Sequence, residues 1–212
     1  MPVLKEGYPF IIPPLFAGLA MIVFFRIKGM GTSPAGITFT CIGIILVVFA
    51  LFCMFFFRDP KIEITQGDNI ILSPCNGTVM ELEEGDEKII RVFLSVFNVH
   101  LQRSPIEGTV TSVKHQDGKF LMAWDPRAHS LNEQNIITIQ GADGIYTVRQ
   151  IAGFLARRCV SWVKAGDTLN AGDKIGMIKF SSQVNLYMPS GVEIKVKPGD
   201  KVRAGITVMG TK

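Results

Sequence analysis

"IGMIKFSSQVNLYMP", residues 175–189, joins two alternating apolar runs through a pair of adjacent serines, Ser181 and Ser182. Alternation with a period of about two residues is typical of β-strands whose faces meet different surroundings. The stretch therefore predicts two consecutive strands. A polar turn is the commoner reason for a serine pair between strands, so any further role has to come from the rest of the chain.

The remainder of residues 58–212 repeats this pattern of short strands separated by turn residues. Alternating runs occupy residues 89–96, 108–115, 135–141, 145–153 and 192–197. The stretch "FLARRCVSWV", residues 154–163, fits either a short helix or a strand. Such a series of short strands indicates an all-β sandwich or barrel.

Short motifs also recur within this region. "SPCNGTV" at 73–79 returns as "SPIEGTV" at 104–110, and "KAGDTLNAGDKIG" at 164–176 is echoed by "KPGDKVRAG" at 197–205. Each Gly-Asp pair marks a turn before a strand, so we predict a mainly β, barrel-sandwich-like domain that folds back on itself. Similar turns occur in lipoyl and biotinyl carrier domains and in membrane adaptor barrels, which leaves a non-enzymatic binding module as an alternative.

The first 57 residues have a different character. Residues 8–25 and 35–57 carry no charge, and the second stretch reaches the roughly 20 residues that a membrane-crossing helix needs. Pro13 and Pro14 are expected to break or kink the first stretch, which suits a re-entrant or interfacial segment. The absence of an A-x-A motif near it disfavours a cleaved signal peptide. We predict an N-terminal apolar helical hairpin that anchors the chain in the membrane.

Basic residues flank both apolar stretches. Arg26 and Lys28 lie between them, and Arg58 and Lys61 follow the second. A hairpin that crosses the bilayer would place these pairs on opposite sides, which the positive-inside tendency disfavours. A hairpin entering one leaflet would keep both pairs on the cytoplasmic face of the cell membrane, where we expect the β domain.

Charge and cysteine content narrow the choice of partners. The net charge of +4, from 22 basic and 18 acidic residues, is too small to indicate nucleic-acid binding but suits an anionic membrane surface. The four cysteines form no C-x-x-C pair and no regular framework. We therefore expect a reducing compartment, no structural disulfide and no metal site.

The order of the longer motifs is more specific than any one of them. They are "FFFRDP" (55–60), "SPCNGTV", "FLSVFNVHLQRSPIEGTV" (93–110), "DGKFLMAWDPRAHSLNEQN" (117–135), "VRQIAGFLARRCVSWVKAGD" (148–167) and the opening stretch. Together they resemble the short, membrane-associated form of phosphatidylserine decarboxylase, a pyruvoyl-dependent enzyme of phospholipid synthesis. The resemblance covers nearly the whole chain and is weakest in the apolar segments.

This resemblance implies self-cleavage between Ser181 and Ser182, giving a β chain of residues 1–181 and an α chain of residues 182–212. The Ser182 hydroxyl would attack the preceding carbonyl, and elimination and hydrolysis would leave a covalent pyruvoyl group. That group would form a Schiff base with phosphatidylserine or a related serine phospholipid and release CO2 and phosphatidylethanolamine. Ser181 stands where the family has glycine, and its Cβ is expected to slow cleavage.

The resemblance also assigns roles to other residues. His100 is expected to be the proton donor, since an imidazole titrates near working pH, although a lone histidine at a strand end is more often structural. Asn76 stands where the family usually has an aspartate that orients or charges a histidine for self-cleavage. Arg103 is expected to attract phosphate or carboxylate, with a solvated loop charge as the alternative. His115 and His129 are expected to be surface residues.

Two departures from the family, at Ser181 and Asn76, keep the alternative open: an uncleaved, inactive, membrane-anchored barrel that binds lipid or protein. If cleavage occurs, the α and β chains should stay together, because the strands on both sides of the cut belong to one barrel. Exposed strand edges after cleavage favour a homodimer.

Overall fold

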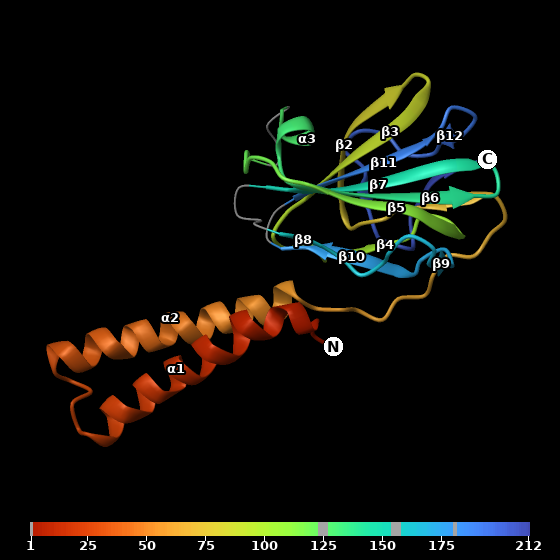
Figure 1. The fold of residues 1–212 in the computed structure, drawn as a ribbon. Coiled ribbons are helices and arrows are strands. Elements are labelled where there is room, and N and C mark those ends of the chain that lie inside the picture. Colours follow the sequence, from red (N-terminus) through yellow and green to blue (C-terminus); the bar gives the residue numbers. More distant parts are fainter. Residues whose placement is uncertain (1, 123–126, 154–157, 180–181) are drawn as a thin grey trace. The chain divides into compact units, whose positions relative to one another are not determined.

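The computed structural model describes residues 2–122, 127–153, 158–179 and 182–212. The chain forms two compact units, Met1–Lys61 and Ile62–Lys212 (Figure 1). The first is a pair of helices and the second is built mainly from strands, which confirms the predicted fold class.

The first unit is an antiparallel helical hairpin. A short 3-10 turn, η1 (Lys5–Gly7), leads into α1 (Tyr8–Ile27), and α2 (Pro34–Phe56) returns beside it. The helices approach closely where Gly18 meets Gly43, since a Cβ on Gly18 would lie 2.6 Å from the Gly43 carbonyl oxygen. Small residues allow such backbone contact between apolar helices, so these glycines set the crossing point.

The expected break at Pro13 and Pro14 does not occur, because α1 runs through both residues. Proline fits the helical φ, and an apolar helix packed against a neighbour tolerates the missing N–H and the crowding of the preceding turn. With 20 and 23 residues, the helices are about 30 and 35 Å long. Both are long and apolar enough to cross a membrane.

The second unit contains three antiparallel sheets (Figure 1). The largest has eight strands in the order β13-β2-β3-β11-β7-β6-β5-β9, and the smaller two have the orders β1-β14-β12 and β4-β10-β8. In chain order the strands are β1 (Ile70–Leu72), β2 (Gly77–Glu84), β3 (Glu87–Leu94), β4 (Leu101–Arg103), β5 (Gly108–Gln116), β6 (Gln134–Gly141), β7 (Gly144–Ala152), β8 (Cys159–Ser161), β9 (Thr168–Leu169), β10 (Lys174–Ile178), β11 (Ser182–Pro189), β12 (Glu193–Ile194), β13 (Lys201–Val202) and β14 (Val208–Thr211).

Most of the predicted strands are confirmed. The runs at 89–96, 108–115, 135–141 and 145–153 correspond to β3, β5, β6 and β7, whereas only Glu193–Ile194 of the run at 192–197 pairs as a strand. In the stretch 154–163, which fits either a helix or a strand by sequence, Cys159–Ser161 is a strand, and residues 154–157 lie outside the described residues. The short helix α3 (Ala128–Leu131) was not predicted.

The Gly-Asp repeats form turns of one geometry. At residues 164–167, 170–173 and 197–200, the aspartate N–H donates to the first carbonyl of the turn and the aspartate carboxylate accepts from the first N–H. The glycines Gly166, Gly172 and Gly199 have φ values of +93°, +86° and +93°. A positive φ at the third position explains why glycine recurs there, and it confirms the predicted turns.

One buried cluster joins the three sheets. It draws side chains from every sheet, for example Ile71 of β1, Ile175 of β10 and Val184 of β11. β11 lies at the centre of this arrangement, paired over eight residues with β3 and over six with β7. The first residue of that central strand is Ser182.

Candidate active site

Ser182 is the first residue of the central strand β11, and its side-chain hydroxyl has an unusual environment. It pairs with Leu94 of β3 and Ala152 of β7, and its side chain is fully buried. The hydroxyl makes no hydrogen bond with any residue that the structure describes. Buried hydroxyls nearly always have a partner, so this one is an exception that favours a chemical role. Its neighbour Ser181 lies outside the described residues.

The Ser182 side chain faces the interior of the barrel. Side chains two residues apart in a strand share a face, and Val184 belongs to the buried cluster. Ala152, which pairs with Ser182, belongs to the same cluster. β7 therefore places only a methyl group beside the hydroxyl.

His100 approaches the same interior from the opposite side. It immediately precedes β4, where the Gln102 side chain accepts a hydrogen bond from Gln150 of β7 over 2.8 Å. Gln102 thus faces the large sheet, and alternation turns the His100 ring the same way. His100 is almost completely buried, with 1% of its surface exposed.

A backbone link brings His100 and Ser182 to the same end of the barrel. The N–H of Ile178, the last residue of β10, donates to the His100 carbonyl over 3.2 Å. Ile178 precedes Ser182 by four residues, a length of chain that spans at most about 14 Å. Both predicted catalytic residues therefore line one end of the interior.

The turn before His100 fixes the orientation of its ring. The imidazole Nδ1 lies 3.0 Å from the Asn98 carbonyl, which can only accept, so Nδ1 donates and the neutral ring carries its lone pair on Nε2. The Asn98 side chain in turn accepts from the N–H and the hydroxyl of Ser95, each over 2.9 Å. Such an oriented ring can accept or return a proton at Nε2.

Asn76 lies beside this turn. It shares with Ser95 and Asn98 the lining of a cavity of about 400 Å³. Its side-chain oxygen accepts from the backbone N–H of Ala204 over 3.0 Å. The described contact therefore supports the neighbouring loop, and the predicted influence of Asn76 on a catalytic histidine stays a prediction.

Arg103 lies in β4 but on the face opposite to His100, as alternation requires. Its Nη1 donates to the Gly172 carbonyl over 2.8 Å, and only 9% of the residue is exposed. The alternative of a solvated loop charge is therefore wrong. The structure does not bring Arg103 together with Ser182, and anion binding by Arg103 stays a prediction.

Sequence reasoning missed Glu133, which lies just before β6. The Ala152 N–H donates to the Glu133 carbonyl over 2.9 Å, so Glu133, Ala152 and Ser182 form one row across three strands. Glu133 is buried with 9% of its surface exposed. Glu133 lies within "LNEQN", residues 131–135, where the sequence shows no alternation of apolar and polar residues. Only the pairing of the strands shows that Glu133 lies in the same row as Ser182.

A chain of buried amides ties the strand of His100 to the large sheet. The Gln102 amide donates to the His100 carbonyl over 2.8 Å, Gln150 donates to Gln102 over 2.8 Å, and Asn135 donates to Gln150 over 3.1 Å. At the far end, His115 Nδ1 donates to the Asn135 oxygen over 2.8 Å. The His115 side chain is 49% exposed, which agrees with its predicted surface position, and the side chain of His129 lies outside the described part.

We expect Gln150→Leu to destabilise the protein because it leaves the Gln102 oxygen and the Asn135 amide buried without their partner. Each of the two unsatisfied groups costs about 1–3 kcal/mol, so the free energy of unfolding should fall by about 2–6 kcal/mol. Denaturant unfolding in detergent measures this change. Gln140→Leu, at an exposed position of β6, is the matched control, and an equal loss in both variants would contradict the role of the buried chain.

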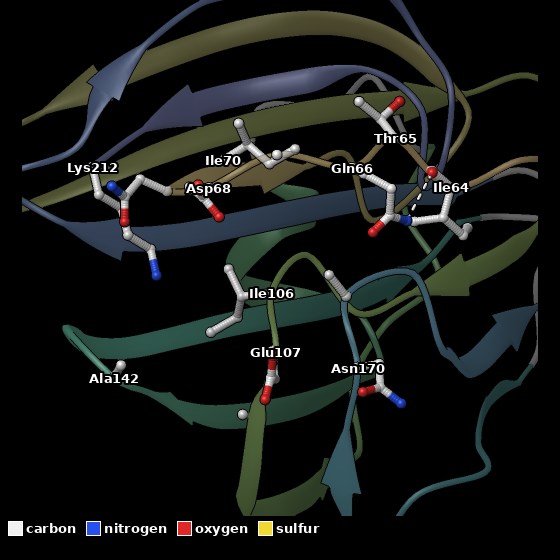
Figure 2. Close-up of a pocket in the computed structure, with 14 residues that line it drawn as sticks. Ile64, Thr65, Gln66, Asp68, Ile70, Ile106, Glu107, Ala142, Asn170 and Lys212 are labelled. Atoms are coloured by element: carbon white, nitrogen blue, oxygen red, sulfur yellow. Dashed lines mark hydrogen bonds between the residues drawn. The ribbon is translucent and has the colours of Figure 1, made fainter.

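A second hollow, of about 720 Å³, lies near the opposite end of β7 (Figure 2). Asp68, Glu107 and Lys212 contribute its charged lining, and none of the predicted site residues belongs to it. Among the residues that the structure describes, no three His, Cys, Asp or Glu side chains gather to hold a metal ion.

Comparison with known proteins gives matches over most of the chain. The family model described as phosphatidylserine decarboxylase matches residues 49–210. Three relatives are named phosphatidylserine decarboxylase proenzyme. The relative from Symbiobacterium thermophilum is 38% identical over 97% of this chain and 94% of its own length. The relative from Carboxydothermus hydrogenoformans is 42% identical over 80% of this chain and 84% of its own length. The relative from Geotalea uraniireducens is 38% identical over 99% of this chain and 96% of its own length. With matches that run almost from end to end, this chain belongs to the phosphatidylserine decarboxylase family.

Proposed function

We propose that this protein is a phosphatidylserine decarboxylase proenzyme, which cuts itself between Ser181 and Ser182 and converts phosphatidylserine to phosphatidylethanolamine and CO2. The observation that carries the proposal is the buried Ser182 hydroxyl, which has no hydrogen-bond partner among the described residues and begins the central strand. A hydroxyl with no competing partner is available to attack the carbonyl of residue 181.

Self-cleavage requires a group that removes the hydroxyl proton. His100 is suited to this because its Nδ1 is held by the Asn98 carbonyl and its lone pair lies on Nε2. The attack converts the amide between residues 181 and 182 to an ester. Elimination then releases the carboxyl group of residue 181, and hydrolysis of the remaining dehydroalanine releases ammonia and leaves the pyruvoyl group at residue 182.

The Ser182 position fits such a group, because it is buried and flanked by the small side chain of Ala152. The pyruvoyl group supplies a ketone that captures the headgroup amine and accepts the electrons left when CO2 departs. His100 then supplies the proton that replaces the lost carboxylate. Burial of the surrounding residues excludes water that would compete for this proton transfer.

The two chains should remain one particle after the cut. Residues 182–212 contain β11, β12, β13 and β14. Of these, β11 pairs with β3 and β7, β13 with β2, and β14 with β1 of the other chain, whereas β12 pairs with β14. β11 is hydrogen-bonded on both sides, to β3 and to β7, so separating the two chains would expose the centre of the core. A homodimer of this two-chain particle stays a prediction.

We also propose that α1 and α2 hold the protein in the cell membrane, with the β unit on the cytoplasmic face. The length and apolar composition of both helices support membrane association. A lipid substrate then reaches the enzyme by diffusion within the bilayer, and the anchor keeps enzyme and substrate in the same phase.

Intact-mass measurement of the purified protein tests the proposal. We expect two species, residues 1–181 and residues 182–212, in place of the 23.3 kDa chain, with the small one blocked at its amino terminus and reactive toward hydrazines. Native mass spectrometry should show both in one particle. A single uncut chain that no hydrazine modifies would favour the alternative, an inactive binding module.

A further inference from the structure

Glu133 is a buried carboxylate that the proposed chemistry leaves unexplained. Its Oε1 lies 3.4 Å from the Cys159 N–H, a long hydrogen bond, and no ion pair joins Glu133 to a cation within the described ranges. Burying an uncompensated carboxylate is costly, so buried carboxylates are usually paired with a cation, bound to a metal or kept protonated.

The location of Glu133 indicates where that cation comes from. Cys159 pairs with Ile178, whose N–H donates to the His100 carbonyl. On the other side, Glu133 is linked through Ala152 to Ser182. Hydrogen bonds thus run from Ser182 through Glu133 to His100, with the Glu133 carboxylate itself forming the link to Cys159.

The Glu133 side chain shares the interior face with Ser182. Asn135 and Ile137 of β6 face the interior, and alternation carries that direction back to Glu133. Adjacent strands lie about 4.8 Å apart, so the Cα atoms of Glu133 and Ser182 are separated by about 10 Å. Ala152 is the residue between them, and it presents only a methyl group on this face.

We propose that Glu133 binds the ammonium group of the serine headgroup, beside the electrophile that Ser182 provides. This inference rests on the proposed function and adds to it the residue that recognises the substrate amine. The carboxylate also accepts one proton from the ammonium, which leaves a neutral amine with a lone pair and a protonated Glu133. Only the neutral amine can add to a ketone, so binding and activation occur at the same place.

The test compares Glu133→Gln with Glu87→Gln, an exposed glutamate at the start of β3. Glutamine keeps the shape and the hydrogen bond to Cys159 but removes the charge. Cleavage is followed by intact mass and the ketone by phenylhydrazine labelling, because phenylhydrazine is a neutral nucleophile at pH 7 that needs no carboxylate. Binding is then measured on cleaved protein whose ketone has been reduced with borohydride, using micelles of phosphatidylserine or of N-acetylated phosphatidylserine.

We expect Glu133→Gln to be cleaved and labelled within about twofold of the parent. Its preference for phosphatidylserine over the N-acetylated lipid should fall at least about 30-fold, the typical result of removing one partner of a buried charge pair. Glu87→Gln should keep the parent's preference. An unchanged preference in Glu133→Gln, or an equal loss of labelling and preference, would overturn the inference. An uncut parent would instead overturn the proposed function, and the lipid comparison would then be made on the uncut protein.

Discussion

Replacing Ser182 with alanine is expected to abolish self-cleavage completely and leave one chain of 23.3 kDa. The reaction needs an oxygen on the Cβ of residue 182, first as the attacking group and then as the leaving group, and alanine has none. Decarboxylation should vanish with it, since no ketone forms. Intact mass and phenylhydrazine labelling, compared with the cleaved parent, measure the effect.

A matched substitution at residue 181 distinguishes the role of Ser181 in cleavage from that of Ser182. Ser181→Gly removes a Cβ that restricts the backbone. We expect it to be cleaved at least as fast as the parent, when cleavage is followed in protein made by cell-free synthesis. Cleavage of the Ser182→Ala chain at the same bond would refute the assignment of the nucleophile.

Replacing His100 with glutamine is expected to lower decarboxylation by about 10²–10⁴-fold, the usual contribution of a positioned acid or base. Glutamine fits the buried site but cannot exchange a proton near neutral pH. The rate of phosphatidylethanolamine formation should be divided by the amount of phenylhydrazine-reactive ketone, so that slower self-cleavage is not mistaken for slower decarboxylation.

His115→Gln is the control for this variant. Its half-exposed ring is replaced by an amide that can still donate to Asn135, so the rate should stay within about threefold of the parent. Retention of more than a tenth of the parent rate in His100→Gln would show that another group returns the proton.

The sequence by itself determined the local features of this protein. The two-residue alternation of residues 89–96 or 145–153 depends only on which faces are apolar, and the φ values of Gly166 and Gly199 follow from a turn of four residues. The two apolar stretches likewise specify helices without help from the rest of the chain. Ser182 and His100 were identified from motif order, which is also a property of the linear chain.

Other expectations failed because their outcome depends on neighbours. Pro13 and Pro14 are accommodated in α1, which packs against α2, and the Arg103 charge is buried against the Gly172 carbonyl rather than solvated. Neither contact can be inferred from adjacent residues, because the partners lie far away in the sequence.

Only the tertiary structure decided which residues surround Ser182. β11 pairs with β3 and β7, which lie about 90 and 35 residues earlier in the chain, and this pairing brings Leu94 and Ala152 to its first residue. Glu133 enters the same row through Ala152, and the Gln102–Gln150 bond turns His100 toward it. Alternation tells which residues share a face of one strand, but the choice of neighbouring strands is made by long-range hydrogen bonding and core packing.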